Sequence, residues 1–177
     1  MNSGLLLLLP LFLVFRTVES TPTEGLQVFN HSGNPLDAQL RLLAVMNLMQ
    51  QQWSLYSGRW YKLFELELMW VPAENFCREL GGHLVSIADL AENDFVHHLR
   101  KKNNIWIGLN KVNQREGPYG WSDGSPLNFL NWDSSQPNEP EVDCVYMAFN
   151  QDLRGTWFDY SCQSKLPQYF VCELFLG

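Results

Sequence analysis

Two stretches of the hydrophobic pattern at the N-terminus predict a processing signal. Leu5–Leu9 and Leu11–Phe15 form a nearly continuous apolar run of about a dozen residues, which suits a signal-peptide core and is too short to span a bilayer. Val18 and Ser20 suit the −3 and −1 positions of a signal-peptidase cleavage site, so residues 1–20 are predicted to be a signal peptide. The residues before the apolar run include no Lys or Arg, which departs from the usual signal.

The next apolar pattern has helical spacing and follows a polar leader. A helix is predicted from Pro35 to Gln52, with Asn34 as its cap. Its apolar positions form two rows. The first row is Leu36, Leu40 and Leu43, and the second is Leu42, Val45, Met46, Met49 and Trp53. Two interpretations stay open: the helix packs against its own domain, or Leu36–Gln52 is a short neck that joins copies of the chain. Residues 21–57 are therefore a leader followed by an amphipathic helix.

After Gly58 the pattern changes to short segments separated by turns, and residues 58–177 are predicted to form one domain. Alternating or apolar segments predict strands at Arg59–Phe64, His83–Ile87, Ile105–Leu109, Asp143–Phe149, Gly155–Phe158 and Tyr169–Leu174. One helix opens at Pro72 and ends at Gly81-Gly82. A second runs from Asp89 to Lys101, with Asp89 and Glu92 at capping-box spacing.

A long connection separates the middle strands from the last ones. Asn110–Asn138 is rich in Gly, Ser, Asn and Pro, and a connection of this length is usually functional or disordered. Its aromatic residues, Tyr119, Trp121, Phe129 and Trp132, indicate an ordered segment.

Charge and export narrow the possible partners. The formal net charge is −7, and without a basic cluster the chain is a poor candidate for binding nucleic acid. No segment after the signal is long enough to cross a membrane, so the mature protein is expected to be secreted and extracellular. Asn30 begins the N-x-[ST] sequence Asn30-His31-Ser32, which predicts a glycan on the exposed leader.

The four cysteines, Cys77, Cys144, Cys162 and Cys172, indicate two disulfides in an exported chain. Their spacing leaves all three pairings open. A structural zinc site is disfavoured, since no C-x-x-C pair occurs and no histidine lies near the cysteines.

A series of short motifs then occurs in a fixed order along the domain. They are Trp60-Tyr61, Trp70 with Ala73 and Cys77, Gly81 to Ile87, Trp106 to Leu109, Trp121 to Gly124, Asn131-Trp132, Gln136-Pro137-Asn138, Asp143 to Val145, Gly155-Thr156-Trp157, Cys162 and Tyr169 to Glu173. In this order the motifs resemble the C-type lectin-like domain in its short form, from about Trp60 to Glu173.

The resemblance implies an α+β fold in which two helices flank a small antiparallel sheet and a long loop region carries the ligand site. It also implies the pairing Cys77–Cys172 and Cys144–Cys162, each worth about 2–4 kcal/mol. At the family's positions, Trp106, Trp121 and Trp157 are expected to fill the core around the loops rather than to stack on a ligand.

Sugar-binding members of that family hold a calcium ion in the long loop region. The resemblance assigns Gln136 and Asn138 to the tripeptide that supplies ligands, and Asp159 to the Asp of a W-N-D triplet. Two further ligand positions fall on Val142 and Phe158, which have no side-chain oxygen, and Lys111 replaces an acidic residue of the accessory site. Since calcium takes six to eight oxygens, the predicted site is degenerate unless two nearby carboxylates, Glu139 and Glu141, replace the missing ligands.

The sequence therefore leaves two functions open. The first is a secreted lectin that binds a glycan or a cell-surface glycoprotein with a weak calcium site made from Gln136, Asn138, Glu139, Glu141 and Asp159. The second is a calcium-independent module that binds a protein or a surface, because fold does not determine function. An enzyme is disfavoured: no G-x-S-x-G, H-E-x-x-H or phosphate loop occurs, and His97 and His98 do not converge on their helix.

Overall fold

The computed structural model describes residues 35–112, 117–149, 155–164 and 169–176. The predictions of a signal peptide at 1–20, a polar leader and a glycan at Asn30 lie outside the described residues.

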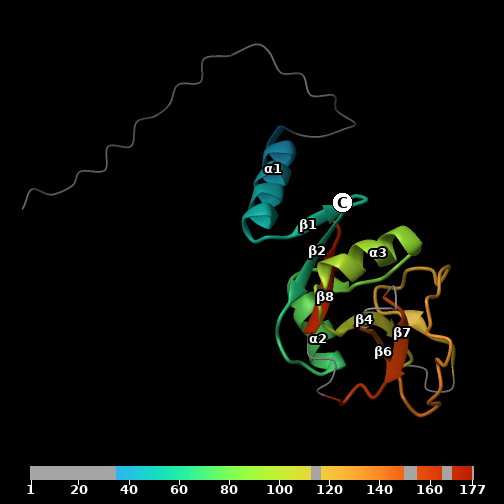
Figure 1. Ribbon diagram of the computed structural model, residues 1–177. Helices are drawn as coiled ribbons and strands as arrows, with labels where there is room; N and C mark the ends of the chain where they lie inside the picture. Colours follow the sequence, from blue (N-terminus) through green and yellow to red (C-terminus); the bar gives the residue numbers. More distant parts are fainter. Residues whose placement is uncertain (1–34, 113–116, 150–154, 165–168, 177) are drawn as a thin grey trace, which may run out of the picture. The chain divides into compact units, whose positions relative to one another are not determined.

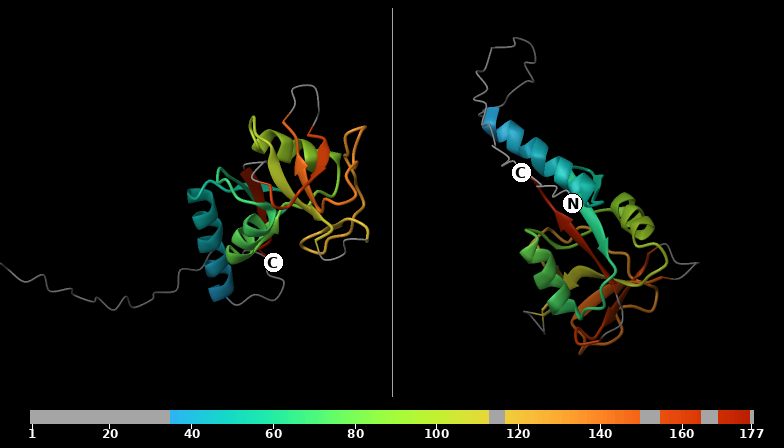
Figure 2. Two further views of the ribbon diagram at one scale, coloured as in Figure 1. Left: turned by 90° about the horizontal axis from the view of Figure 1, so that it is seen from below. Right: turned by 90° about the vertical axis from the view of Figure 1, so that its left-hand side faces the viewer.

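Within these residues, three helices and eight strands alternate along the chain (Figure 1). The helices are α1 (Pro35–Gln50), α2 (Trp70–Glu79) and α3 (Leu90–Leu99). The strands are β1 (Ser54–Tyr56), β2 (Arg59–Phe64), β3 (His83–Leu84), β4 (Ile105–Asn110), β5 (Gly120–Trp121), β6 (Cys144–Met147), β7 (Trp157–Tyr160) and β8 (Tyr169–Leu174). Helices α2 and α3 lie on opposite sides of β2 and β8, as Figures 1 and 2 show, which confirms the expected flanking helices.

The strands form one sheet in the order β1-β2-β8-β4-β6-β7, with β3 added to β8 and β5 added to β4. The expected antiparallel pairing needs one correction: β4 and β8 run parallel, with Ile105 opposite Tyr169. Parallel neighbours need a long crossover, and here the chain from β5 to β7 provides it.

Local interactions explain where the helices begin. Asp89 caps α3 by accepting a hydrogen bond from the backbone N–H of Glu92 at 2.8 Å, which confirms the capping position. The Glu92 carboxylate reaches back to the N–H of Ala88 at 2.7 Å. Helix α2 begins at Trp70 and not at Pro72, because a proline in the first turn loses no intrahelical hydrogen bond.

Several predicted boundaries were one to three residues too long. Helices α1 and α3 each end two residues early, because Gln52 and Lys101 take left-handed backbone angles with φ of 63° and 58°. Strand β3 ends at Leu84 because the carbonyl of Val85 accepts from Gly108 and the N–H of Ser86 donates to the Glu173 carboxylate. The two strands around the second disulfide shorten to Cys144–Met147 and shift to Trp157–Tyr160.

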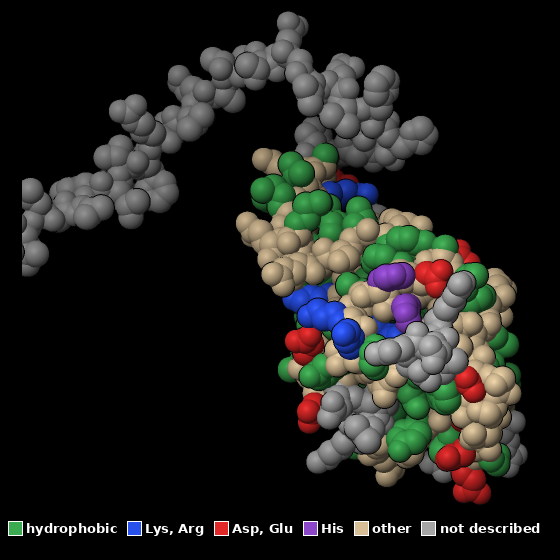
Figure 3. Space-filling view, in the orientation of Figure 1, with side chains coloured by type: hydrophobic (Ala, Val, Ile, Leu, Met, Phe, Trp, Pro, Cys, Tyr) green, Lys and Arg blue, Asp and Glu red, His purple; other side chains and the backbone are tan. Residues whose placement is uncertain are grey.

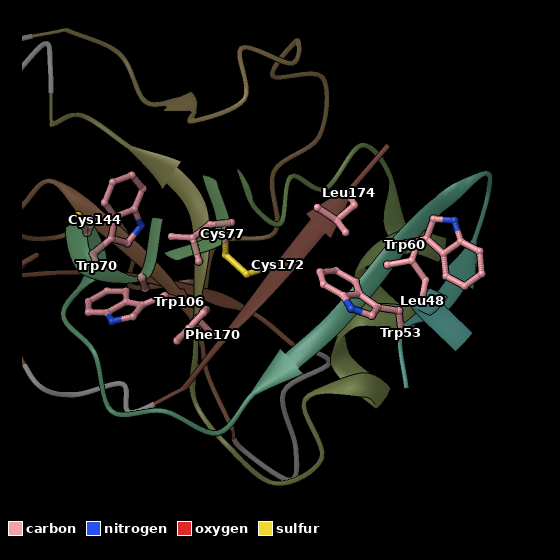
Figure 4. Close-up of a cluster of buried hydrophobic side chains, with 12 residues drawn as sticks. Leu48, Trp53, Trp60, Trp70, Cys77, Trp106, Cys144, Phe170, Cys172 and Leu174 are labelled. Carbon is pink, nitrogen blue, oxygen red and sulfur yellow. A yellow bond between two sulfur atoms is a disulfide. The ribbon is translucent and has the colours of Figure 1, made fainter. Parts of the chain in front are cut away.

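Two hydrophobic clusters pack on the two faces of the sheet. On β8, Phe170 and Cys172 belong to one cluster and Val171 to the other, as expected when side chains alternate across a strand. Figure 4 shows the first cluster, where Trp70, Trp106 and Phe170 surround the Cys77–Cys172 disulfide. Trp106, Trp121 and Trp157 are all buried, which confirms their core assignment.

Both disulfides expected from the family resemblance are present. Cys77 of α2 is bonded to Cys172 of β8, which lies 95 positions later in the sequence, and their Cα atoms are 5.4 Å apart. Cys144 of β6 is bonded to Cys162, 18 residues later. The first bond joins a helix to the central part of the sheet, and the second closes the β6–β7 hairpin.

Helix α1 contacts the rest of the domain through few side chains. Val45 and Leu48 pack against the first cluster beside Trp53. Leu48 belongs to neither predicted row. Six apolar side chains of those rows are 50–59% exposed, namely Leu36, Leu40, Leu42, Leu43, Met46 and Met49, and apolar side chains cover much of α1 in Figure 3. Helix α1 therefore packs against its own domain through Val45 and Leu48, while these six side chains of the rows remain exposed in the described part of the chain.

None of the described helices is long and apolar enough to cross a membrane.

Candidate functional site

The segment between β5 and β6 is an ordered loop beside β6 and β7 (Figure 1). The N–H of Trp157 donates to the carbonyl of Asn131 at 2.8 Å, and the N–H of Asp133 donates to the carbonyl of Trp157 at 3.0 Å. The Trp157 ring lies 5.6 Å from Phe129 and 6.2 Å from Trp132, measured between ring centroids. Strand β7 and the aromatic cluster thus hold the loop in place, as its aromatic content predicted.

Three of the predicted site residues meet at the end of this loop. Asp159 of β7 is only 4% exposed, and its carboxylate accepts hydrogen bonds from the N–H groups of Asn138 at 3.3 Å and Glu139 at 3.0 Å. The Oε1 atom of Gln136 accepts from the N–H of Asp159 at 3.2 Å. Gln136 is joined to Pro137 by a cis peptide bond. The loop therefore closes onto β7 through hydrogen bonds within the protein.

The other two predicted ligands, Glu139 and Glu141, are exposed on the same loop. No group of three or more His, Cys, Asp or Glu side chains in the described residues is placed to hold a metal ion. The alternation of Glu139 and Glu141 therefore does not produce a carboxylate cluster.

The residues present do not fit a calcium ion well. Calcium takes six to eight oxygen ligands, and affinity falls as carboxylates are lost. Both carboxylate oxygens of Asp159 already accept backbone hydrogen bonds, so they are directed at Asn138 and Glu139. Lys111 lines the same hollow of about 270 Å³ as Asp159 and Asn138, and its positive charge there disfavours a second cation.

Lys111 stabilises the loop from the opposite side. Its ammonium group donates to the carbonyl of Pro140 at 3.3 Å and lies 4.8 Å from the centroid of the Tyr119 ring. Its backbone N–H donates to the carbonyl of Asp143 at 2.7 Å. Burial, together with the nearby charges of Asp159 and Asp143, raises the pKa of Tyr119, so this phenol is neutral at physiological pH.

Phe158 takes part in an aromatic patch that the sequence analysis missed. Its ring stacks on Tyr146 with centroids 5.5 Å apart, and Tyr160 meets Tyr146 edge-on at 5.8 Å. The three residues lie on one face of the β6–β7 hairpin, where Tyr146 is opposite Phe158. Alternation of aromatic residues along the two strands was the available signal. A position that carries a calcium ligand in lectins of the family thus serves ring packing here.

The model of the lectin C-type domain matches residues 67–174. The chain belongs to the C-type lectin domain family. Families of this domain are generally binding modules without catalytic activity, which agrees with the lack of catalytic motifs in the sequence.

Two relatives show how different proteins use the C-type lectin domain. The low affinity immunoglobulin epsilon Fc receptor of Mus musculus is 37% identical over 130 residues, which is 72% of this chain and 37% of the receptor. One chain of the snaclec coagulation factor IX/factor X-binding protein of Trimeresurus stejnegeri is 38% identical over 130 residues, covering 68% of this chain and 81% of the snaclec chain. The present chain therefore spans about a third of the mouse receptor and most of the snaclec chain.

Three solved structures share the fold. The cow carbohydrate-recognition domain of CD23, determined in the presence of a GlcNAc2Man3 oligosaccharide, is 31% identical with a TM-score of 0.63, covering 71% of this chain and 94% of that domain. A calcium-independent type II antifreeze protein is 26% identical with a TM-score of 0.62, covering 68% and 89% of the two chains. The trimeric Kupffer cell receptor Clec4f is 29% identical with a TM-score of 0.67, covering 79% and 93%.

The Asp159→Ala substitution tests whether this carboxylate holds the loop. It removes the acceptor of two backbone N–H groups, so we expect the free energy of unfolding in urea to fall by about 1–2 kcal/mol. Asp133→Ala is the matched control, because the Asp133 carboxylate accepts only from Ser135 at the surface, and we expect a change within about 0.5 kcal/mol. Equal losses in the two variants would contradict the role of Asp159.

Proposed function

We propose that this chain is an extracellular recognition module that binds its ligand, a glycan or a cell-surface glycoprotein, through the loop surface around Gln136, Asn138 and Asp159 without calcium. The observation that supports this most directly is the use of both Asp159 carboxylate oxygens by backbone N–H groups of the loop. Lys111 supports it further, since its ammonium group bonds to the Pro140 carbonyl on the same loop. A loop held in this way keeps its conformation without a metal ion.

A second candidate is the lectin with a weak calcium site that the family resemblance implied. The meeting of Gln136, Asn138 and Asp159 at one loop end favours it, since these are the residues that match the sugar-binding pattern. The likeness to the cow CD23 domain, studied with an oligosaccharide, supports a glycan ligand in either case. The likeness to a calcium-independent antifreeze protein supports the first candidate.

Thermal unfolding in millimolar calcium and in excess chelator distinguishes the two candidates. For calcium-independent binding we expect the same midpoint in both, because no native-state ligand is removed. An ion bound only by the native state at a hundredfold excess over its Kd would add about 2.7 kcal/mol, a shift of several degrees. Such a shift, if lost in Asp159→Ala, would overturn the first candidate in favour of the second.

We also infer that the chain is exported, cleaved after Ser20 and glycosylated at Asn30. The apolar run before Arg16 and the two paired disulfides support this, since disulfides persist in oxidising compartments. Expression in a secreting eukaryotic cell should yield protein in the medium that begins at Thr21. Intact-mass spectrometry should show one N-glycan that is missing in Asn30→Gln, and retention of residues 1–20 would contradict the inference.

We further infer that α1 joins copies of the chain. A helix that is apolar on several sides is normally covered, and the six exposed side chains defined above lie on a helix of 16 residues, a length at which packing rather than propensity supplies most of the stability. A second copy of α1 presents the same rows, so association can bury both. The trimeric Clec4f structure, which matches a larger share of this chain than the two other structures described above, is consistent with such assembly.

Sedimentation velocity of the full chain tests this neck. We expect an oligomer for the unmodified protein and a monomer for the double variant Leu40→Gln/Leu43→Gln, because two exposed leucines of one row become polar. The control Leu66→Gln/Leu90→Gln changes two exposed leucines outside α1 and should leave the oligomer intact. A monomeric unmodified protein would remove the proposal.

A further inference from the structure

A second hollow lies on the other side of Lys111 and Tyr119 from the loop site. Its volume is about 380 Å³, and it opens between α2 and the described residues 110–112 and 118–122. Trp70, Asn75 and Arg78 line it from α2, and Lys111 and Tyr119 line it from the opposite wall. Because Lys111 and Tyr119 also line the smaller hollow beside Asp159, the two hollows are neighbours with a shared wall.

The polar groups at the base of this hollow are already used within the protein. The Glu74 carboxylate contacts His83 Nδ1 at 2.6 Å and accepts from the N–H of Leu84 at 2.9 Å and the hydroxyl of Ser122 at 3.0 Å. The Asn110 amide donates to the carbonyls of Gly108 and Gly120 and accepts from Val112. The base therefore offers a ligand few hydrogen bonds.

Apart from the exposed Asn75 amide, the side chains left to bind a ligand are cationic. Arg78 is exposed and takes part in none of the ion pairs within the described part of the chain. Lys111 makes one long hydrogen bond to a carbonyl and carries no paired acid among those ion pairs. Guanidinium and ammonium groups only donate, so the hollow selects a ligand with anionic acceptors. This preference is local, because the chain as a whole has a net charge of −7.

The neighbouring hollow has the complementary chemistry. Asn138, Glu139 and Pro137 line it, so an amide and a carboxylate are available to bond with hydroxyl groups. The half-buried Tyr119 ring separates the two hollows and offers an aromatic surface for the apolar face of a sugar ring. A ligand that carries hydroxyls at one end and an acid group at the other therefore matches the polar hollow, the Tyr119 ring and the cationic hollow in that order.

We propose that the hollow between α2 and β5 binds the acidic group, a carboxylate or sulfate, of a glycan. Arg78 and Lys111 bind the acidic group, while the neutral part of the glycan lies across Tyr119 toward Asn138 and Glu139. This assignment rests on the proposed function, because it takes the loop surface as the place where the glycan binds.

Isothermal titration calorimetry at low salt compares three probes: a heparin-derived tetrasaccharide, neutral chitotetraose and a hexaglutamate peptide. We expect the tetrasaccharide to bind at least tenfold more tightly than the other two. Chitotetraose removes the acid groups, and hexaglutamate keeps them on a peptide. Equal affinity for chitotetraose would overturn the acidic subsite. Equal affinity for hexaglutamate would overturn the assignment of a glycan as the ligand. Absence of tetrasaccharide binding would overturn the whole proposal.

Charge-removing variants locate the subsite. Arg78→Gln and Lys111→Gln should each weaken tetrasaccharide binding about five- to tenfold, since each removes a charged donor. Lys102→Gln removes the same charge from an exposed residue that does not line either hollow, and should change affinity less than twofold. An equal loss in Lys102→Gln would show diffuse attraction and overturn the proposal. Circular dichroism melts check that all three variants fold.

The same titrations with chelator separate this proposal from the proposed function. Binding that is lost in Arg78→Gln and unchanged by chelator supports both. Binding abolished by chelator but still weakened by Arg78→Gln overturns calcium independence and keeps the acidic subsite. Binding unchanged by either treatment overturns the subsite alone.

Discussion

Strand β8 and its bond to α2 are the constraint on which the rest of the domain depends. In the sheet β8 lies between β2 and β4 and also pairs with β3, so it joins the C-terminal part of the domain to three earlier strands. The Cys77–Cys172 disulfide closes a loop of 95 residues through this strand, and cross-linking a loop of about 100 residues is worth roughly 4.7 kcal/mol in a chain-entropy description. Its neighbour Glu173 is buried and forms an ion pair with the partly exposed Arg59, and burial raises the pKa of Glu173 while Arg59 opposes the rise. The framework is therefore rigid where the loops are attached.

On that framework the loop region is held by aromatic packing and hydrogen bonds within the protein. The loop between β5 and β6 packs its aromatic side chains around Trp157, and its end closes on Asp159 through backbone N–H groups. Asp159 is a carboxylate that accepts from the loop, and Lys111 is a cation that donates to it. These contacts give the loop internal cross-links of the kind a metal ion could otherwise provide. The result is a surface whose chemistry is set by exposed amides, carboxylates and cations.

The candidate site was only partly predictable from the sequence, because its contacts form between segments that are distant in the chain. Gln136, Asn138 and Asp159 were found because their local motifs resemble the family, and the structure brings them together. The direction of the Asp159 carboxylate was not predictable, because it depends on where the Asn138 and Glu139 N–H groups lie after the loop folds. The role of Phe158 was missed, since its partner Tyr146 is on another strand. The cationic hollow was missed because Arg78 and Lys111 are far apart in sequence.

The sequence by itself determined the features that depend on neighbouring residues and on motif order. These include the Asp89 cap, the strands Arg59–Phe64 and Tyr169–Leu174, the burial of the three tryptophans and, through the family resemblance, the disulfide pairing. Tertiary structure alone decided which apolar side chains of α1 stay exposed, that β4 and β8 run parallel, and which groups Asp159 and Lys111 contact. Periodicity reports the conformation of a segment, whereas the partner of a side chain depends on how distant segments pack. For that reason the elements and, through the family resemblance, the fold class could be predicted from the sequence, whereas the contacts within the candidate site could not.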